Sequence, residues 1–411
     1  VLIMENKKTV AILCAGGPAP GINTVVATIT KRFLSDGYRV IGLNHGYSTL
    51  FKDATNYIEL TYEIADRIYL KGGSYLKMSR YKPNKEEFND RFFKKENIKL
   101  LVTIGGDDTA STANRISLFL EEHNVNIQNI HVPKTIDNDL PLPTGIFTFG
   151  FQTAKDEGTR LAKTILEDAR SNDSWFVVSA MGRTAGHLAL GIGNACHYPM
   201  IIIPEMFNKS KITFDNIMKL IISTMVKRKL MDIHFGGVII SEGVFHYIDE
   251  SDIKNSGIIF SYDDHGHPEL GLLSKSHIFN QLLEVELKKL NLKIKCRPVE
   301  IGYATRCVDP IAFDLRFCTT LGNAVKELYD NGDTRCIVIS TPQGEYQALS
   351  MSDISDAEGI IAPRLVNMQS QETKSIMKSF ETLTTNDLDA AKAYLPDPEN
   401  YTMKSILKFE L

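Results

Sequence analysis

Short apolar runs alternate with helical patterns along most of the chain. Runs of about five to seven mostly apolar residues fit strands that are buried on both faces. Such runs occupy residues 9–15, 39–43, 100–104, 174–180, 198–204 and 236–241. Helical patterns cover residues 24–35, 107–121, 213–229, 277–290 and a long stretch after 309. This alternation predicts an α/β fold with mainly parallel, doubly wound sheets.

Composition adds limits to this picture. The chain has 411 residues, 43% of them hydrophobic and 23% charged, which allows two or three domains with cores of their own. A net charge of -4 gives no general attraction for nucleic acid or an anionic membrane, so a phosphate ligand would need a local site. No apolar run approaches the ~20 residues of a membrane span. We therefore expect no nucleic acid and no membrane among the partners.

The cysteines indicate a compartment. The six Cys residues are scattered without a Cys-x-x-Cys pair, so the sequence suggests neither a zinc site nor a disulfide framework. The first eight residues are too few and too polar for a signal peptide. A reducing cytoplasm fits this usage best, and we expect a cytoplasmic enzyme.

The segment 132–143 carries the strongest chemical signal. Asp137 and Asp139 stand two residues apart between prolines, with Lys134 and Thr135 just upstream. In an extended segment, side chains two residues apart point the same way, so the two carboxylates could converge. Carboxylates beside an ammonium suit Mg²⁺, phosphate and proton transfer together. The plainer alternative is a polar loop whose aspartates accept backbone N–H bonds.

Glycine-rich turns follow two of the predicted strands. Residues 16–23 (Gly-Gly-Pro-Ala-Pro-Gly-Ile-Asn) and 105–109 (Gly-Gly-Asp-Asp-Thr) each lead from a strand into a helix. This arrangement lets backbone N–H groups and a helix N-terminus surround a phosphate. The dinucleotide pattern Gly-x-Gly-x-x-Gly is absent. Each turn is also compatible with a simple tight connection, and the two acids with helix capping.

Other charged residues in loops and after predicted strands could also bind a ligand. Arg80 ends a glycine-containing basic loop and is a candidate phosphate clamp, because a guanidinium fork matches phosphate oxygens. Asp107, Asp137, Arg183 and Glu242 follow predicted strands, where ligands bind in parallel sheets. Arg297 and Arg306 lie nine residues apart and could equally be surface arginines. Residues 246–275 are interpreted as a polar insertion, and the tail from Glu381 as a helical appendage.

Together these stretches resemble the 6-phosphofructokinases from about residue 9 to 330. The resemblance rests on the segments Gly-Gly-Pro-Ala-Pro-Gly-Ile-Asn, Gly-Gly-Ser-x4-Ser-Arg, Gly-Gly-Asp-Asp-Thr, Pro-Lys-Thr-Ile-Asp-Asn-Asp, Met-Gly-Arg, Ser-Glu-Gly and Arg-Pro-Val-Glu-Ile-Gly-Tyr. The resemblance implies two doubly wound domains with the active site in the cleft between them. Residues 1–149 with about 305–355 would bind the phosphate donor. Residues 150–304 with about 356–411 would bind the sugar phosphate and carry the insertion.

Two positions indicate a branch of that family. ATP-using members commonly have Gly where this chain has Asp108 and Lys134. The Asp108 carboxylate would conflict with the α-phosphate and ribose of a nucleotide, whereas Lys134 could neutralise the terminal phosphate of a shorter donor. The pair is similar to that of the pyrophosphate-dependent members. The implied reaction is reversible transfer from pyrophosphate to the 1-hydroxyl of fructose 6-phosphate, giving fructose 1,6-bisphosphate and phosphate in glycolysis and gluconeogenesis.

The resemblance also implies roles for single residues. Asp137 would be the general base, helped by Lys134 and Arg183, and Asp107 would hold Mg²⁺ on the donor. Pyrophosphate would be bound by Gly16, Gly17, Arg80, Asp108, Thr109 and Lys134. Fructose 6-phosphate would be bound by Thr135, Asp137, Asp139, Met181, Gly182, Arg183, Glu242, Arg297, Tyr303 and Arg306. In relatives the Arg297 position reaches in from a neighbouring subunit, which implies a homodimer or homotetramer.

The chain departs from the family pattern in places. Ser174 replaces an arginine of the bacterial ATP-dependent members, and whether Arg170 substitutes for it is open. The family's usual Gln-Arg-Gly-Gly becomes Thr-Arg-Cys-Val at 305–308, which puts the local backbone geometry in question. Two alternatives remain: an ATP-dependent phosphofructokinase that accommodates Asp108 and Lys134, and a non-catalytic regulatory subunit. The second would be expected to lose the base or metal carboxylate, yet Asp107, Asp137 and Asp139 are present.

Overall fold

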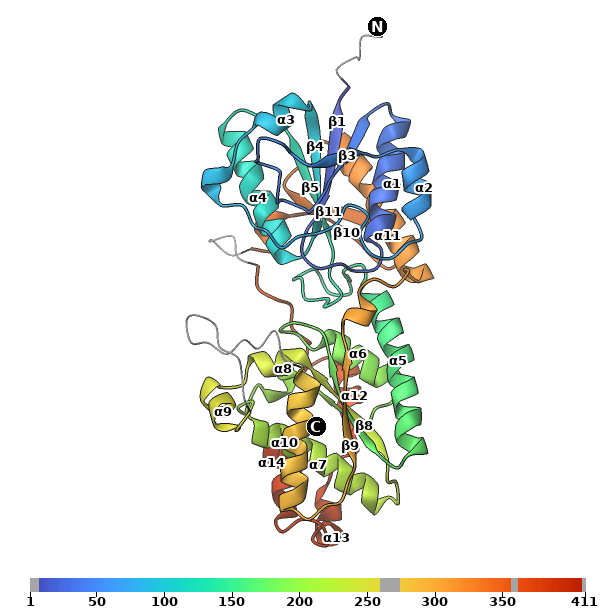
Figure 1. Cartoon of the computed structure of the whole chain (residues 1–411), viewed down its shortest axis with the longest axis vertical. Helices are drawn as coiled ribbons and strands as arrows, with labels where there is room; N and C mark the ends of the chain where they lie inside the picture. Colours follow the sequence, from blue (N-terminus) through green and yellow to red (C-terminus); the bar gives the residue numbers. More distant parts are fainter. Residues whose placement is uncertain (1–6, 259–273, 356–360, 409–411) are drawn as a thin grey trace. The chain divides into compact units, whose positions relative to one another are not determined.

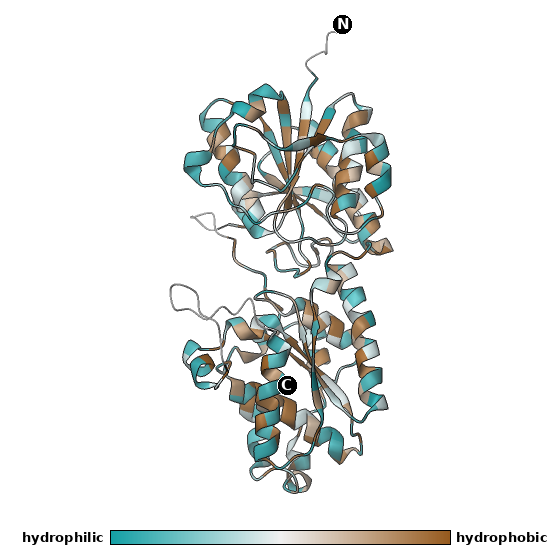
Figure 2. Ribbon diagram, viewed as in Figure 1, coloured by the Kyte–Doolittle hydropathy of each residue, from teal (hydrophilic) through white to brown (hydrophobic). Residues whose placement is uncertain are grey.

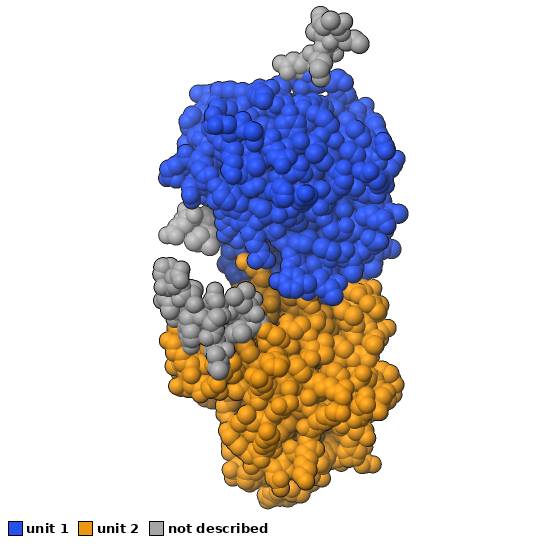
Figure 3. Space-filling view, viewed as in Figure 1, with its two compact units in different colours: residues 1–154, 303–364 blue, residues 155–302, 365–411 orange. Residues whose placement is uncertain are grey.

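A computed structural model describes residues 7–258, 274–355 and 361–408 of the chain. The chain divides into two compact units, coloured separately in Figure 3. Unit 1 comprises residues 1–154 and 303–364, and unit 2 comprises residues 155–302 and 365–411. Part of the predicted polar insertion, residues 259–273, lies outside the described residues.

Unit 1 is built on a mainly parallel sheet. Its described strands are β1 (Thr9–Cys14), β2 (Arg39–Leu43), β3 (Tyr57–Glu59), β4 (Ile98–Gly105), β5 (Gln128–Pro133), β10 (Cys336–Ser340) and β11 (Tyr346–Ser350). The order across the sheet is β11-β10-β5-β4-β1-β2-β3. Strands β10, β5, β4, β1 and β2 pair in parallel, and β3 and β11 add antiparallel edges.

Helices cover both faces of this sheet (Figure 1). They are α1 (Ile22–Ser35), α2 (Tyr62–Ile68), α3 (Arg91–Lys95), α4 (Asp107–Glu122) and α11 (Ala312–Asp330). Alternate β1 residues enter two separate cores, because successive side chains of a strand point to opposite faces. Val10 and Ile12 pack with residues of α1 and α11, whereas Ala11 and Leu13 pack with residues of α3 and α4. This two-sided burial is why β1 is an unbroken apolar run, and Figure 2 shows the sheet as a hydrophobic centre.

Unit 2 holds a smaller sheet in which all described pairs are parallel. Its strands are β6 (Trp175–Ala180), β7 (Met200–Ile202), β8 (Gly236–Ser241) and β9 (Cys296–Ile301), in the order β7-β8-β6-β9. Its longer helices are α6 (His187–Ala195), α7 (Phe214–Leu230), α10 (Lys275–Lys289) and α12 (Gln371–Lys378). Shorter helices are α8 (Glu242–His246), α9 (Glu250–Asn255), α13 (Leu388–Ala391) and α14 (Met403–Leu407). Helix α5 (Phe151–Ser171) begins in unit 1 and continues into unit 2.

The predicted α/β class with mainly parallel sheets is confirmed. Strands 39–43 and 236–241 have the predicted bounds, and most other elements agree within about two residues. The strand predicted at 198–204 is shorter, Met200–Ile202, because Pro204 starts a 3₁₀ turn. Helix α5 and the strand pair β10–β11 were not predicted. In the part of the chain that the structure describes, we find no helix with the length and apolarity of a membrane span.

Candidate active site

The first glycine turn of unit 1 connects β1 to α1. Gly16 has a φ of +88° and donates its N–H to the Ser79 carbonyl at 2.9 Å, which ties the turn to the loop that carries Arg80. A Cβ at Gly17 would lie 2.2 Å from Nη2 of Arg306, so a side chain at this position would displace that guanidinium. The turn therefore brings half-buried glycine backbone next to a cation. A glycine turn beside a guanidinium suits an anionic ligand.

Lys134 follows β5 and lies beside the same turn. Its backbone N–H donates to the Gly105 carbonyl at 2.9 Å, and its ammonium donates to the Gly17 carbonyl. The Lys134 side chain is buried, and this desolvation lowers its pKa to about 8. Asp137 opposes the shift and Arg306 adds to it. The ammonium, the guanidinium and the carboxylate of Asp137 thus belong to one electrostatic cluster.

The Asp137–Asp139 segment differs from the extended geometry expected from its sequence. Asn138, between the two aspartates, has a φ of +53°, in the left-handed region that asparagine tolerates better than most residues. Both aspartates are buried, each with 7% of its surface exposed. The Asp137 N–H donates to Thr135 Oγ1 at 3.0 Å, and Thr148 Oγ1 donates to the Thr135 carbonyl at 2.8 Å. The alternation argument for convergence was therefore wrong, because the segment turns at Asn138.

The second glycine turn places two acids at the start of α4. Asp107 is half-buried, and Asp108 is exposed and forms an ion pair with Lys82 at 2.8 Å. Thr109 is buried, and its hydroxyl lies 2.3 Å from the point where a Cβ at Gly105 would stand. Glycine at 105 is therefore required for this close approach.

The fit of Asp107 to a magnesium ion depends on the kind of site. Within the described ranges, no group of three or more His, Cys, Asp or Glu side chains is arranged to hold a metal. Mg²⁺ on a phosphate donor needs only one or two carboxylates, because phosphate oxygens and water supply the other ligands. Asp107, at a strand end beside the glycine turn, fits such a site.

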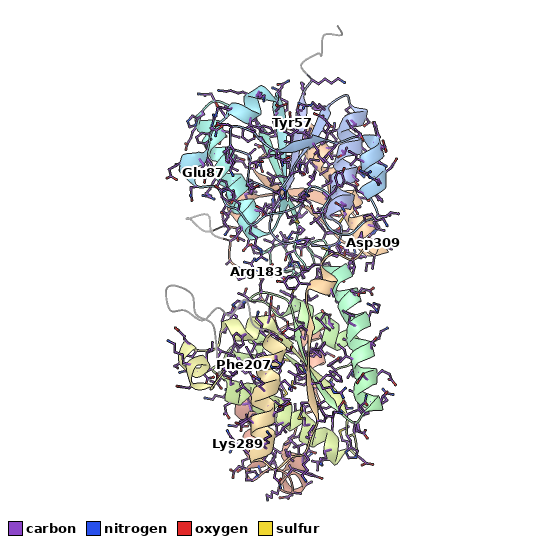
Figure 4. The ribbon with its side chains drawn as sticks, viewed as in Figure 1. Tyr57, Glu87, Arg183, Phe207, Lys289 and Asp309 are labelled. Atoms are coloured by element: carbon purple, nitrogen blue, oxygen red, sulfur yellow. The ribbon has the colours of Figure 1, made fainter. Side chains whose placement is uncertain are left out.

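Unit 2 carries a second cluster, at the carboxyl ends of β6 and β8. Glu242, the first residue of α8, accepts the backbone N–H of Gly182 at 3.1 Å and that of Arg183 at 2.7 Å. Arg183, labelled in Figure 4, has a φ of +53°. The Met181 N–H donates to the Ile301 carbonyl at 3.1 Å. One carboxylate thus holds the turn that presents the Arg183 side chain.

Of the three remaining predicted residues, Arg297 lies in unit 2, whereas Tyr303 and Arg306 lie together in unit 1. Arg297, in β9, pairs in register with Phe176 at the start of β6, the end of that strand away from Met181. It forms an ion pair with Asp168 at 3.4 Å. Within one chain, the structure therefore does not bring Arg297 to the 181–183 turn. Tyr303 is 77% exposed, and Arg306 stacks on its ring at 5.1 Å.

Some residues that shape these clusters were not predicted from the sequence. Lys82 pairs with Asp108, and buried His131 bridges Thr103 Oγ1 at 2.9 Å and the Gly105 carbonyl at 3.0 Å. Its burial lowers its pKa to about 3, so the imidazole is neutral. No sequence motif marks Lys82 or His131. His131 could have been suspected only as a polar residue inside an apolar strand.

Comparison with known proteins completes this description. A family model described as phosphofructokinase matches residues 9–329. The chain belongs to the phosphofructokinase family. A pyrophosphate–fructose 6-phosphate 1-phosphotransferase of Thermotoga maritima is 37% identical over 92% of this chain and 91% of its own length. The enzyme of the same name from Naegleria fowleri is 36% identical over 90% of this chain and 87% of its own.

Solved structures agree at the level of the fold. A pyrophosphate-dependent phosphofructokinase of Nitrosospira multiformis has a TM-score of 0.69 at 17% identity, covering 98% of this chain and 93% of that one. At this identity the likeness shows the phosphofructokinase fold alone. The expected fold family is thereby confirmed.

Proposed function

We propose that the protein transfers a phosphoryl group reversibly from pyrophosphate to the 1-hydroxyl of fructose 6-phosphate, the reaction of diphosphate–fructose-6-phosphate 1-phosphotransferase (EC 2.7.1.90). The observation that carries this proposal is the buried ammonium of Lys134 beside the glycine turn, with Asp108 at the start of α4. The relatives from Thermotoga maritima and Naegleria fowleri, which align over most of the chain, carry this activity in their names.

The donor site lies in unit 1. Gly16 and Gly17, Arg80, Asp108 with Thr109, and Lys134 bind pyrophosphate. Lys134 neutralises its terminal phosphate, and Asp108 excludes a nucleotide by placing a carboxylate where the α-phosphate and ribose would run. The bond between the two phosphates breaks, and orthophosphate leaves as the sugar oxygen bonds to phosphorus.

The base is Asp137. It accepts the proton of the 1-hydroxyl as that oxygen attacks phosphorus, and Asp139 helps to orient it. Its burial and its N–H contact to Thr135 support this role, because a preorganised carboxylate needs no rearrangement at the moment of transfer. Bound magnesium would supply neutralisation of developing phosphate charge, with Asp107 as the protein ligand.

The sugar phosphate is bound mainly by unit 2. Met181 and Gly182 contact the sugar, Arg183 faces the transferred phosphoryl group, and Glu242 fixes their turn. Arg297, together with Tyr303 and Arg306, binds the 6-phosphate. Because Arg297 lies away from the 181–183 turn of its own chain, it serves a neighbouring subunit, and the protein is a homodimer or homotetramer.

The cell compartment is a further part of the proposal. The six cysteines are all unbonded thiols, and burial raises the pKa of Cys14 to about 12. Free thiols of this kind persist in a reducing environment, which supports a cytoplasmic location.

The deciding experiment offers pyrophosphate and ATP in parallel with Mg²⁺ and fructose 6-phosphate, and measures fructose 1,6-bisphosphate. We expect product with pyrophosphate and none with ATP. Product with ATP alone would keep the fold and the base but reject the donor assignment. Product with neither donor would favour a regulatory subunit or another sugar phosphate.

A further inference from the structure

Arg364 lies in a segment that the family model does not reach. The match ends at residue 329, and Arg364 follows in the last described part of unit 1. Its guanidinium donates hydrogen bonds to four acceptor atoms between residues 138 and 146. These are the Asn138 carbonyl, at 3.0 Å from Nη2 and 3.3 Å from Nε, Asn138 Oδ1 at 2.6 Å, the Leu142 carbonyl at 3.2 Å and the Ile146 carbonyl at 2.9 Å. The Arg364 backbone N–H donates to the Asp139 carbonyl at 2.6 Å.

These contacts act on the left-handed position of the catalytic turn, residues 137–139. Few non-glycine residues adopt the left-handed region, and Asn138 occupies it between the two aspartates. Asn138 Oδ1 accepts from Arg364 and also from the Thr148 N–H at 3.2 Å. Both the carbonyl and the side chain of Asn138 are therefore held by a residue 226 positions away.

The segment that carries Arg364 is itself anchored. Ile361 packs against an apolar cluster that includes Leu140, Leu142, Ile146 and residues of β10. The same cluster supports the chain directly after the catalytic turn. Arg364 is thus attached to the structure that it stabilises, and its half-buried side chain donates to the carbonyl groups of three residues.

We infer that Arg364 is a positioning residue for phosphoryl transfer, which holds the 137–139 turn in the conformation that aims the base. This inference rests on the proposed function, because it assigns Asp137 the role of base. Only a guanidinium offers several N–H donors at fixed angles, whereas a lysine offers one compact charge. A base displaced by about 1 Å loses about 100-fold in rate, so the effect belongs mainly in kcat.

The test compares Arg364→Ala and Arg364→Lys with Arg335→Ala. Arg335 immediately precedes β10, which runs parallel to β5, so it lies at the opposite end of these strands from the catalytic turn. Its side chain pairs with Glu121 at 3.7 Å. We expect Arg364→Ala to lose about 100-fold in kcat, with the KM for fructose 6-phosphate changed by no more than about threefold. Arg364→Lys should lose at least about tenfold, because the fork is lost. Arg335→Ala should match the wild type.

Chemical rescue separates positioning from general support. Millimolar guanidinium chloride should restore part of the kcat of Arg364→Ala, while sodium chloride at equal ionic strength should not. Wild-type kcat in a folded Arg364→Ala protein would overturn the inference. Failure of both variants to fold would also overturn it, because the role would then be structural.

The two proposals fail separately. If the wild type makes no product from pyrophosphate and fructose 6-phosphate, the proposed function is wrong and the inference falls with it. If the wild type is active and the Arg364 variants equal it, only the role of Arg364 is wrong.

Discussion

Lys82 Nζ lies 2.8 Å from Asp108 Oδ1, directly at the start of α4. Both side chains are more than half exposed, so the pair contributes at most about 1 kcal/mol to folding. Its importance lies in where it puts charge. It places a carboxylate and an ammonium at the N-terminus of α4, within the proposed donor site.

Asp108 and Lys134 are the two charged residues proposed to select the phosphate donor, so removing both should change which donor is used. We expect the double variant Asp108→Gly with Lys134→Gly to lose about 100-fold or more in kcat/KM for pyrophosphate, because neutralisation of the terminal phosphate is lost. Weak activity with ATP should appear. Steady-state kinetics with each donor measures both effects.

A matched control removes one acid and one base elsewhere in unit 1. Lys31 and Asp66 form an exposed ion pair, with 39% and 70% of their side chains exposed. Lys31→Ala with Asp66→Ala should leave donor preference as in the wild type. Pyrophosphate kinetics that are unchanged in the Asp108/Lys134 variant would show that these residues do not read the donor.

Asp137→Asn removes the proposed base without changing the size of the side chain. We expect kcat to fall about 1000-fold while the KM for fructose 6-phosphate stays within about threefold, because the asparagine cannot take the hydroxyl proton. Initial rates over a range of sugar concentrations measure both. Asp53→Asn, at an exposed ion pair with Arg91, is the control and should be fully active. Near-normal turnover of Asp137→Asn would remove Asp137 from the role of base.

Lys134 should give the pyrophosphate reaction a dependence on pH. Burial lowers its pKa to about 8, so the free enzyme loses this positive charge as the pH rises through about 8. We expect kcat/KM for pyrophosphate to fall above that pH, since this ratio reports on the free enzyme. In Lys134→Arg the fall should disappear, because a guanidinium stays charged. A flat wild-type profile from pH 7 to 9.5 would contradict this assignment.

The same pKa has a consequence for stability. The folded-state pKa of Lys134 lies below its ordinary value of 10.5, so the unfolded chain binds more protons between about 8 and 10.5. The contribution of Lys134 should therefore increase the free energy of unfolding as the pH rises through this window. Urea titrations at several pH values should show that contribution in the wild type and not in Lys134→Met.

Glu242 should act on the sugar phosphate and not on the donor. Its carboxylate accepts the N–H groups of Gly182 and Arg183, so Glu242→Ala releases the turn that presents Arg183. We expect the KM for fructose 6-phosphate to rise about tenfold or more, with the KM for pyrophosphate within about twofold. Glu242→Gln should be milder, because an amide oxygen still accepts hydrogen bonds.

Glu286→Ala, which removes a half-buried carboxylate paired with Lys289, is the control in unit 2 and should leave both constants unchanged. Equal increases of both KM values in Glu242→Ala would instead indicate general loss of structure.

Sequence reasoning was most successful where structure is local. Strand β1 and the turn to α1 follow from an apolar run and from glycines, and both signals lie within about fifteen residues. The prediction of an extended segment failed at Asn138, which has left-handed backbone geometry. The residues between the prolines are compatible with either conformation, so the sequence alone did not distinguish them. Helix α5 was missed because many of its buried positions are small residues, Ala154, Gly158, Ala162 and Ala169, which give a weak apolar pattern.

The amino-acid sequence alone determined the fold class, the family and the types of residue that follow its strands. Gly16, Asp107, Asp137 and Glu242 stand at those positions whatever lies around them. Only the tertiary structure decided how they are held. The pKa of Lys134 depends on burial, and the turn at Asn138 is held by Arg364 from 226 residues away. Desolvation and long-range hydrogen bonds arise when residues distant in the sequence pack together. Such contacts leave no periodic pattern that could be read from the sequence.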